Sequence, residues 1–429
     1  MTLSNRYKLL LLILVSTFSN LSPAQIQISS PYSRYGLGEL QSNHSVYSSG
    51  MGGISFALRN PGYININNPA SYTSFDTNSF TLDVGVISNF TQLRTIDETQ
   101  GFSNHTSLGH VLLGFPITKW CGLSFGLIPF SKTGYRIGMT DSTFENSNIT
   151  ITDTFSGNGG LNQAYIGAAF KLFKNFSAGF NFGYLFGDIS KYRSVFIPDD
   201  PYSYNIRIKN DIEVGSIYLN YGLQYNKNFK NNYSLVLGTR FNLPINISAK
   251  HTQLCERYSG SGNSISIKDT ILNIDDEKGK IYMPLTVGGG FTFTKKNVWL
   301  VGADFDWQNW KKFKSFGEAD SIGNSFIISF GGEYTPQHNA ITGYYKKMTY
   351  RAGFHYSQSY YEIRGIKIND FAVSIGLGFP IRKTRTTLNL AIEAGKKGTI
   401  NNDMLQENYI RLVCGISFRE FWFFRPKLN

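Results

Sequence analysis

Hydrophobic and polar side chains alternate with a period of two from about residue 79 almost to the C-terminus. The clearest run lies at residues 175–190. Its even-numbered positions are apolar: Phe176, Ala178, Phe180, Phe182, Tyr184 and Phe186. Its odd-numbered positions are small or polar: Ser177, Gly179, Asn181, Gly183 and Gly187. Because successive side chains of a strand point to opposite faces, this run predicts a β-strand with one apolar face and one small or polar face. The same split returns at residues 371–379 and 410–418.

Runs of this kind predict about fourteen strands. They lie near residues 79–93, 105–117, 120–131, 159–172, 176–190, 211–226, 233–248, 281–294, 298–310, 324–336, 348–361, 369–381, 385–397 and 408–418. An even number of strands brings the C-terminus back to the side on which the first strand begins, as in bacterial membrane barrels. The predicted fold is therefore all-β, a transmembrane antiparallel β-barrel with an N-terminal plug in its lumen.

The connections between these strands alternate in length. Long polar connections are expected at residues 94–104, 132–158, 191–210, 249–280, 311–323, 362–368 and 398–407, and tight turns near Lys119, Lys174, Asn228, Lys295 and Lys383. One connection, at residues 337–347, stands where a tight turn is expected but is longer than the other turns. Since long loops of such barrels face outside and short turns face the periplasm, this alternation supports the strand count.

The N-terminal residues predict export and a separate first domain. Residues 1–24 combine basic residues, an apolar run of about ten residues and small residues before a cleavage point, which is typical of a signal peptide and too short for a spanning helix. Residues 25–78 are rich in glycine and lack the alternation, so we expect a plug, or hatch, there. Residues 79–429 then form the barrel and end in an aromatic cluster after Phe418.

Composition agrees with a membrane barrel, although a large soluble β-sandwich protein is the competing class. Aromatic residues make up 15% of the chain, charged residues only 16%, and there are 43 glycines. The net charge of +12 is spread over turns and loops rather than gathered into a stripe, which favours anionic lipid headgroups, including lipopolysaccharide, over nucleic acid. A charged surface that is simply solvated is the alternative. Three cysteines, Cys121, Cys255 and Cys414, show no metal spacing and are expected to be free thiols.

Asn68, Pro69 and Ala70 are the first candidate site. Proline fixes φ, lacks an N–H group and pushes the preceding residue toward an extended conformation. The Asn68 amide is then free to bond to barrel backbone, which would hold a gate against the wall. An ordinary turn without a gating role is the alternative.

A second candidate lies on the third predicted strand, where Gly126 and Pro129 interrupt a regular ladder. Proline removes a ladder donor and glycine tolerates bulges, so the strand is expected to kink or open at this point.

Polar residues of inward parity form the third candidate, a polar network in the lumen. They are Asp83, Arg240, Asp304, Asp306, Glu333, Arg351, His355, Glu393 and Arg411. Carboxylates two residues apart are compatible with acid–base chemistry or a cation site. We favour the simpler interpretation, in which these charges pair with each other and with plug residues such as Arg34 and Arg59. No serine or second histidine stands at a hydrolase spacing from His355, and no phosphate loop or zinc motif is present. The sequence therefore predicts neither an enzyme nor a metal or cofactor site.

Three stretches resemble the FadL family of outer-membrane transporters for hydrophobic compounds, in a form similar to its Bacteroidetes members. One runs from Tyr35 through the glycines at residues 50–53 to the Asn-Pro-Ala motif at residues 68–70. Another is the tryptophan-rich strand end at residues 304–313, and the third is the Arg-x-Gly strand at residues 350–356. The resemblance implies a fourteen-strand barrel with an N-terminal hatch and a kinked third strand that opens the wall sideways.

The function implied by the resemblance is passive uptake of a hydrophobic small molecule, such as a long-chain fatty acid or an aromatic hydrocarbon, with lateral release into the outer membrane. The alternative is a barrel that does not transport and instead serves a larger outer-membrane complex for protein secretion or assembly, as relatives of the PorV type do. Outer-membrane lipid, a hydrophobic ligand and other outer-membrane proteins are the expected partners.

Overall fold

The computed structural model describes residues 30–42, 44–96, 100–141, 151–197, 204–260, 264–320, 322–382 and 384–421. The predicted signal peptide at residues 1–24 lies outside these residues, as does the aromatic end of the chain beyond Phe421. Within the described residues, no helix is long and apolar enough to cross a membrane.

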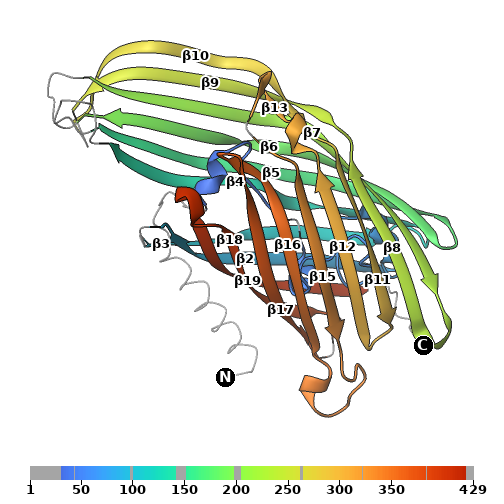
Figure 1. Ribbon diagram of the computed structural model, residues 1–429. Helices are drawn as coiled ribbons and strands as arrows, with labels where there is room; N and C mark the ends of the chain where they lie inside the picture. Colours follow the sequence, from blue (N-terminus) through green and yellow to red (C-terminus); the bar gives the residue numbers. More distant parts are fainter. Residues whose placement is uncertain are drawn as a thin grey trace, which may run out of the picture.

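Fourteen antiparallel strands follow one another around a closed barrel (Figure 1). The strands are β2 (Ser79–Arg94), β3 (Gln100–Pro116), β4 (Cys121–Asp141), β5 (Ile151–Phe173), β6 (Phe176–Phe196), β7 (Asn205–Asn228), β8 (Tyr233–Asn242) with β9 (Ile245–Ser259), β10 (Ser266–Met283) with β11 (Thr286–Lys295), β12 (Trp299–Gln308), β15 (Ser325–Tyr334), β16 (Thr349–Ile363), β17 (Ile366–Pro380), β18 (Thr387–Gly398) and β19 (Gln406–Phe421). Pairing of β19 with β2, from Gln406 opposite Arg94 to Phe421 opposite Ser79, closes the ring. The predicted antiparallel barrel of about fourteen strands is confirmed.

Two of the fourteen strands are each broken once by a proline. Pro244 separates β8 from β9, and Pro284 separates β10 from β11. Proline has no N–H group to give to the ladder, so the hydrogen-bonded pairing stops and resumes on its other side. The two breaks lie at neighbouring points, because β9 pairs with β10 and β8 pairs with β11.

Four of the predicted long loops are wrong, and one of them, residues 362–368, is a tight turn between β16 and β17. Most of residues 132–158, 191–210 and 249–280 continue the strands instead of leaving the sheet. We call the sheet that they form the extension: residues 133–141 of β4, 151–159 of β5, 188–196 of β6, 205–213 of β7, 250–259 of β9 and 266–278 of β10. It projects past the other strands at the upper left of Figure 1. At about 3.3 Å per residue, nine or ten residues reach roughly 30 Å along the strand direction.

Apolar side chains cover the outside of the barrel wall. Phe180, Phe182 and Tyr184 of β6 are 41%, 44% and 50% exposed, whereas the intervening Asn181 is 1% exposed. Ile375 of β17 is 62% exposed and its neighbour Ser374 is buried. The barrel therefore turns its apolar face outward and its small and polar face inward.

Residues 30–78, which we call the N-terminal segment, pack against the inward face of the wall. Its short elements are η1 (Pro31–Arg34), β1 (Glu39–Leu40), α2 (Val46–Ser49) and η2 (Pro69–Ser74). The remaining short elements of the chain are η3 (Lys230–Asn232), η4 (Trp310–Lys312), β13 (Lys314–Ser315), β14 (Glu318–Ala319), η5 (Tyr344–Lys346) and η6 (Asn401–Asp403).

The largest buried apolar cluster lies at the barrel end that carries the extension, which we call the mouth. Tyr32 and Leu37 of the N-terminal segment meet Trp310, Phe313 and Tyr360 there, and each of these side chains is at most 3% exposed. The rings of Trp310 and Tyr360 are stacked with centroids 4.7 Å apart. A second cluster packs Ile64, Tyr72 and Phe75 against β3 and β4. The chain's own aromatic side chains therefore fill the mouth.

Candidate functional site: the barrel interior and the β3–β4 seam

The N-terminal segment touches the wall at inward-facing glycines. A Cβ atom on Gly179 of β6 would lie 2.6 Å from the carbonyl carbon of Pro69, and one on Gly376 of β17 would lie 2.8 Å from the Cα of Gly50. The same close approach of backbone to backbone recurs on four further strands, at Gly122 of β4, Gly238 of β8, Gly331 of β15 and Gly353 of β16. Only glycine lets backbone meet backbone at this distance. The wall is thus shaped to the N-terminal segment from several directions.

The Asn-Pro-Ala motif lies at one of these contacts. The Asn68 side-chain amide donates to the carbonyl oxygens of Phe56, at 2.6 Å, and of Leu223 and Thr239 on β7 and β8, at 3.1 and 3.2 Å. Its Oδ1 accepts from the backbone N–H of Ala70 and so caps η2, which begins at Pro69. Asn68 is fully buried. One side chain therefore ties the N-terminal segment to itself and to two strands of the wall.

Asp304 and Asp306 of β12 face the same part of the N-terminal segment. Asp304 Oδ2 accepts from the backbone N–H groups of Ser55 and Phe56 at 2.5 and 2.9 Å. Asp306 accepts both arms of Arg240, at 3.1 Å from Nε and 2.7 Å from Nη2. The two carboxylates thus have separate structural partners.

The other predicted lumen residues join further ion pairs across neighbouring strands. Arg351 Nε lies 3.3 Å from Glu333, and its guanidinium also lies 4.4 Å from the ring of Tyr47 in the N-terminal segment. Glu393 accepts from Arg411 at 2.8 Å and lies 3.9 Å from His355.

Asp83 of β2 is also held by side chains from neighbouring strands. It accepts from Ser417 Oγ at 3.0 Å and lies 3.6 Å from His110 Nε2. The nine residues expected in the lumen form several local clusters rather than one centre.

Arg34 and Arg59 differ from the expectation that they pair with lumen carboxylates. Arg59 donates to Gln224 Oε1 at 3.1 Å and to Thr73 Oγ1 at 2.8 Å. The Arg34 guanidinium lies 3.9 Å from the ring centroid of Phe155. Burial lowers the pKa of Arg59 to about 10, which still leaves it charged at neutral pH. Both arginines thus contact neutral partners.

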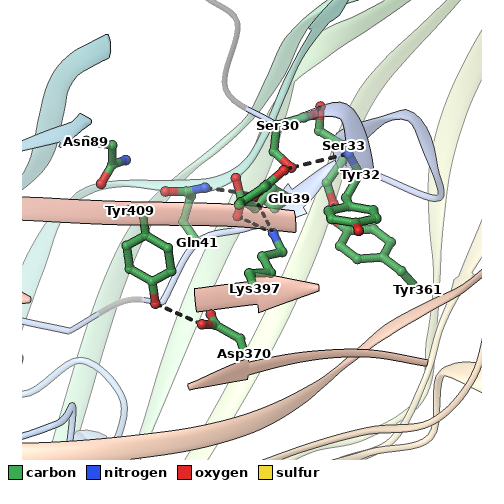
Figure 2. A network of polar contacts seen from close by, with 12 residues as sticks. Ser30, Tyr32, Ser33, Glu39, Gln41, Asn89, Tyr361, Asp370, Lys397 and Tyr409 are labelled. Carbon is green, nitrogen blue, oxygen red and sulfur yellow. Dashed lines mark hydrogen bonds and ion pairs between the residues drawn. The ribbon is translucent and has the colours of Figure 1, made fainter. Parts of the chain in front are cut away.

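A buried ionic network near the mouth was missed from the sequence. Lys397 Nζ of β18 lies 2.7 Å from Glu39 of the N-terminal segment and 3.9 Å from Glu407 of β19 (Figure 2). Ser30 donates to Glu407, and Figure 2 shows the Tyr409 hydroxyl directed at Asp370, at 2.9 Å. Lys397 and Glu407 share the parity of Glu393 and Arg411, so that parity marks them as inward-facing. Because the predicted strands at residues 385–397 and 408–418 end at or next to these two residues, the alternation there does not show which way their side chains point.

His44 of the N-terminal segment lies inside the barrel and is partly buried. Its Nδ1 lies 3.3 Å from the Asn67 side-chain amide. Burial, reinforced by the charges of His355, Arg240 and Arg411, lowers the pKa of His44 to about 3. His44 is therefore neutral at every physiological pH.

The wall has a seam between β3 and β4. Their ladder runs only from Pro116 opposite Gly122 to Val111 opposite Leu127, although both strands continue toward the mouth. Gly126 lies in the last part of this ladder, opposite Leu112, and Pro129 lies just beyond it.

The N-terminal segment takes up the edge of β4 above the ladder. Glu39 and Leu40 pair with Lys132 and Ser131, and the Gln41 N–H donates to the Phe130 carbonyl at 2.9 Å. The candidate opening is thus a real interruption of the ladder that β1 covers from inside.

A small cavity of about 30 Å³ lies behind the seam, between Gly109 and His110 of β3, Ile128 and Pro129 of β4, and His44. That is room for one or two water molecules. Toward the mouth, Lys132 Nζ reaches across to His105 Nε2 at 3.0 Å and to Ser107. Side chains, rather than backbone hydrogen bonds, join the two strands there.

Fold and interior together define a FadL-like β-barrel. Solved structures of similar fold include the Ralstonia pickettii toluene transporter TbuX, at 12% identity and a TM-score of 0.56 over 87% of this chain and 98% of that one. They also include the CymD monoaromatic hydrocarbon channel, at 13% identity and 0.55 over 90% and 98%. A third is a Pseudomonas aeruginosa FadL homologue, at 13% identity and 0.54 over 88% and 98%.

These identities show a shared fold. The chain belongs to the BamG family, whose model matches residues 7–429. No curated protein sequence matches the chain.

Proposed function

We propose that the protein is a closed outer-membrane barrel that works as a subunit of a larger outer-membrane complex for protein secretion or assembly. The outward apolar face of the wall and the signal-like N-terminus support the membrane location. The observation that carries the proposal is the contact of the N-terminal segment, backbone to backbone, with glycines of six wall strands. A plug built in this way is part of the wall's packing rather than a separate lid.

The energy needed to move this plug supports a closed barrel. Four of the hydrogen bonds that join the segment to β7, β8 and β12 involve two side chains: Asn68 donates two to the wall, and Asp304 accepts two from the segment. At a net value of about 1 kcal/mol each, and more for the charged acceptor, their loss costs roughly 4–6 kcal/mol. An open state would then hold less than about one molecule in a thousand.

The proposal is tested by isolating the tagged protein from native membranes in mild detergent. We expect one or more outer-membrane proteins to be recovered with it in fixed stoichiometry, at the endogenous expression level. A tagged unrelated barrel of the same membrane is the control for detergent carry-over. Recovery of the barrel alone, with intact membranes as the source, would overturn the proposal.

A second candidate function is uptake of a hydrophobic small molecule with release through the seam. The interrupted β3–β4 ladder and the cavity beside Pro129 favour it, since they mark the one stretch described above where side chains replace the ladder. Gly126 and Pro129 are then the hinge of the opening.

Uptake of a labelled fatty acid or aromatic hydrocarbon by cells tests this function. Removing the side chain that bridges the seam, Lys132→Ala, is expected to raise uptake several-fold, and Arg136→Ala on the exposed side of the same strand is the control. Equal uptake by deletion, wild-type and Lys132→Ala strains, with an empty barrel in native mass spectrometry, would exclude it.

A further inference from the structure

The extension has two unlike faces. One face carries a row of residues in register across all six strands: Ile137, Phe155, Arg193, Ile208, Cys255 and Leu272. The next row toward the tip contains Met139, Val195 and Ile206 on the same face. We call this the inner face.

The inner face looks over the mouth. Ile189 of β6 is buried in the mouth cluster and pairs with Ile212 of β7. Because side chains of one strand return to the same face every second residue, Arg193 and Ile208 lie on the face that Ile189 and Ile212 share. The Arg34 guanidinium, which comes from the N-terminal segment, lies over Phe155 on this face. The inner face is therefore continuous with the packing of the mouth.

The opposite, outer face is charged, and many of its charges are paired. Ion pairs join Arg207 to Glu256 at 2.6 Å and Lys250 to Asp276 at 2.9 Å. The inner face leaves more apolar side chains open: Met139 is 58%, Ile206 36% and Leu272 40% exposed, whereas on the outer face Tyr192 and Ile267 lie among these paired charges. Water suits the outer face well, whereas exposed apolar side chains gathered on one face mark an interaction site.

Lipid does not reach the inner face. The outward apolar belt ends on β6 at Phe186, and Arg193 stands seven residues further along. With about 3.3 Å per residue and a strand tilt of about 40°, this row lies roughly 15–20 Å above the belt. The inner face also looks toward the barrel axis rather than outward. Its occupant therefore comes from the extracellular side.

Resting on the proposed subunit function, we propose that the inner face is the docking site for a second, different protein, which presents an apolar surface with a carboxylate at its centre. Met, Phe and Arg amid aliphatic side chains are the composition of protein–protein interface cores. Arg193 already binds Asp153 through two nitrogens, and Arg257 lies opposite Asp269. Arg34, in contrast, contacts the ring of Phe155 rather than a carboxylate among the described residues. We therefore expect its guanidinium to pair with a carboxylate of the partner.

The native Cys255 lies on this face and allows a direct test. In a Cys121→Ser, Cys414→Ser background, a thiol-reactive photo-crosslinker on Cys255 is expected to join another outer-membrane protein in intact cells, at a peptide with apolar residues beside an aspartate or glutamate. The matched control moves the thiol to the neighbouring residue on the outer face, Leu254→Cys with Cys255→Ser. Cross-links from Cys255 to a second copy of this chain, to this chain's own loops, or to lipid alone would overturn the proposal.

Charge substitutions separate this inference from the proposed function. Ile208→Glu and Arg34→Glu are expected to reduce the partner recovered with the barrel at least tenfold, whereas Leu254→Glu leaves it unchanged. Reversing the partner's carboxylate to lysine should restore recovery with Arg34→Glu, which a merely misfolded barrel would not allow. If the complex forms but none of these substitutions weakens it, the docking site is wrong and the subunit function stands. If the wild-type barrel recovers no partner, both fail.

Discussion

Glycines on the inner wall are the residues that decide how tightly the barrel holds its N-terminal segment. At Gly179 the backbone of β6 meets the carbonyl of Pro69, and at Gly376 the backbone of β17 meets Gly50. A methyl group at either position has no room unless the segment moves. These glycines are therefore part of the contact with the N-terminal segment, although they belong to the wall.

Gly179→Val is expected to destabilise the protein by about 1–3 kcal/mol, because the added carbons overpack against Pro69 and Ala70. Denaturant or heat titration of the detergent-solubilised barrel measures this change. Gly289→Ala is the control, since the nearest atoms to its new Cβ are 3.8 Å away. Equal stability of the two variants would show that the segment is not held by backbone contact.

His44 makes the stability of the N-terminal segment depend on pH. Its pKa in the folded protein is about 3, below the value of about 6.5 expected when it is unfolded. The unfolded state therefore binds a proton first as the pH falls, and stability that is complete above about pH 6.5 declines below it. Between pH 7 and pH 5 the loss from His44 is about 2 kcal/mol.

Unfolding of wild type and His44→Gln at these two pH values isolates the effect. The wild type is expected to lose about 2 kcal/mol more than the variant on acidification. An identical pH response in the two proteins would contradict a buried neutral His44.

At the scale of elements, a strand can be predicted from the sequence when one of its faces contacts apolar surroundings and the other contacts the packed interior. β6 and β17 alternate cleanly for this reason: the range predicted for β17 is nearly right, and the range predicted for β6 starts correctly but ends six residues early, within the extension. The extension breaks the rule, because its outer face is charged and its inner face mixes Ile208 with Arg193. The chain alternates there too, but not between apolar and small residues. Those strand ends were therefore interpreted as loops.

The candidate site was predictable only in part, for a related reason. Inward parity identifies Asp304 and Arg351 as interior residues, since parity follows from each strand alone. Their partners depend on where the irregular N-terminal segment runs, and no periodicity encodes that path. The contacts of Asp304 with the Ser55 and Phe56 N–H groups and the ion pair of Glu39 with Lys397 are of this kind.

Edge exposure predicts the local stability of the extension. β10 pairs with β9 along residues 266–283, whereas its other edge meets β13 only at Ile281 and Tyr282. Three register shifts interrupt the β9–β10 ladder, as is usual where an edge strand is protected from pairing with other chains. Hydrogen exchange is expected to be at least tenfold faster over residues 266–278 than over the central β6 residues 178–186. Equal protection would mean that another chain covers this edge in the sample.

For the whole molecule, an interior packed with the N-terminal segment predicts that the barrel does not conduct ions. Barrels of 16–18 strands enclose an aqueous channel, and a fourteen-strand barrel without the N-terminal segment would be close to that size. We expect no steady ion conductance from the wild type in a planar bilayer. Asp304→Ala combined with Asn68→Ala, which removes four of the hydrogen bonds that tie the segment to β7, β8 and β12, should produce opening events. A steadily conducting wild type would contradict the closed barrel.

The position of the N-terminal segment also constrains the order in which the chain assembles. The segment precedes β2, yet it contacts strands as late in the chain as β17 and β19, and the ring is sealed only when β19 pairs with β2. Its binding site does not exist until the last third of the chain is in place. The first residues to be made are therefore among the last to find their contacts. Folding of this protein is expected to be slow, as for any chain dominated by contacts between distant residues, and to finish with the packing of the N-terminal segment.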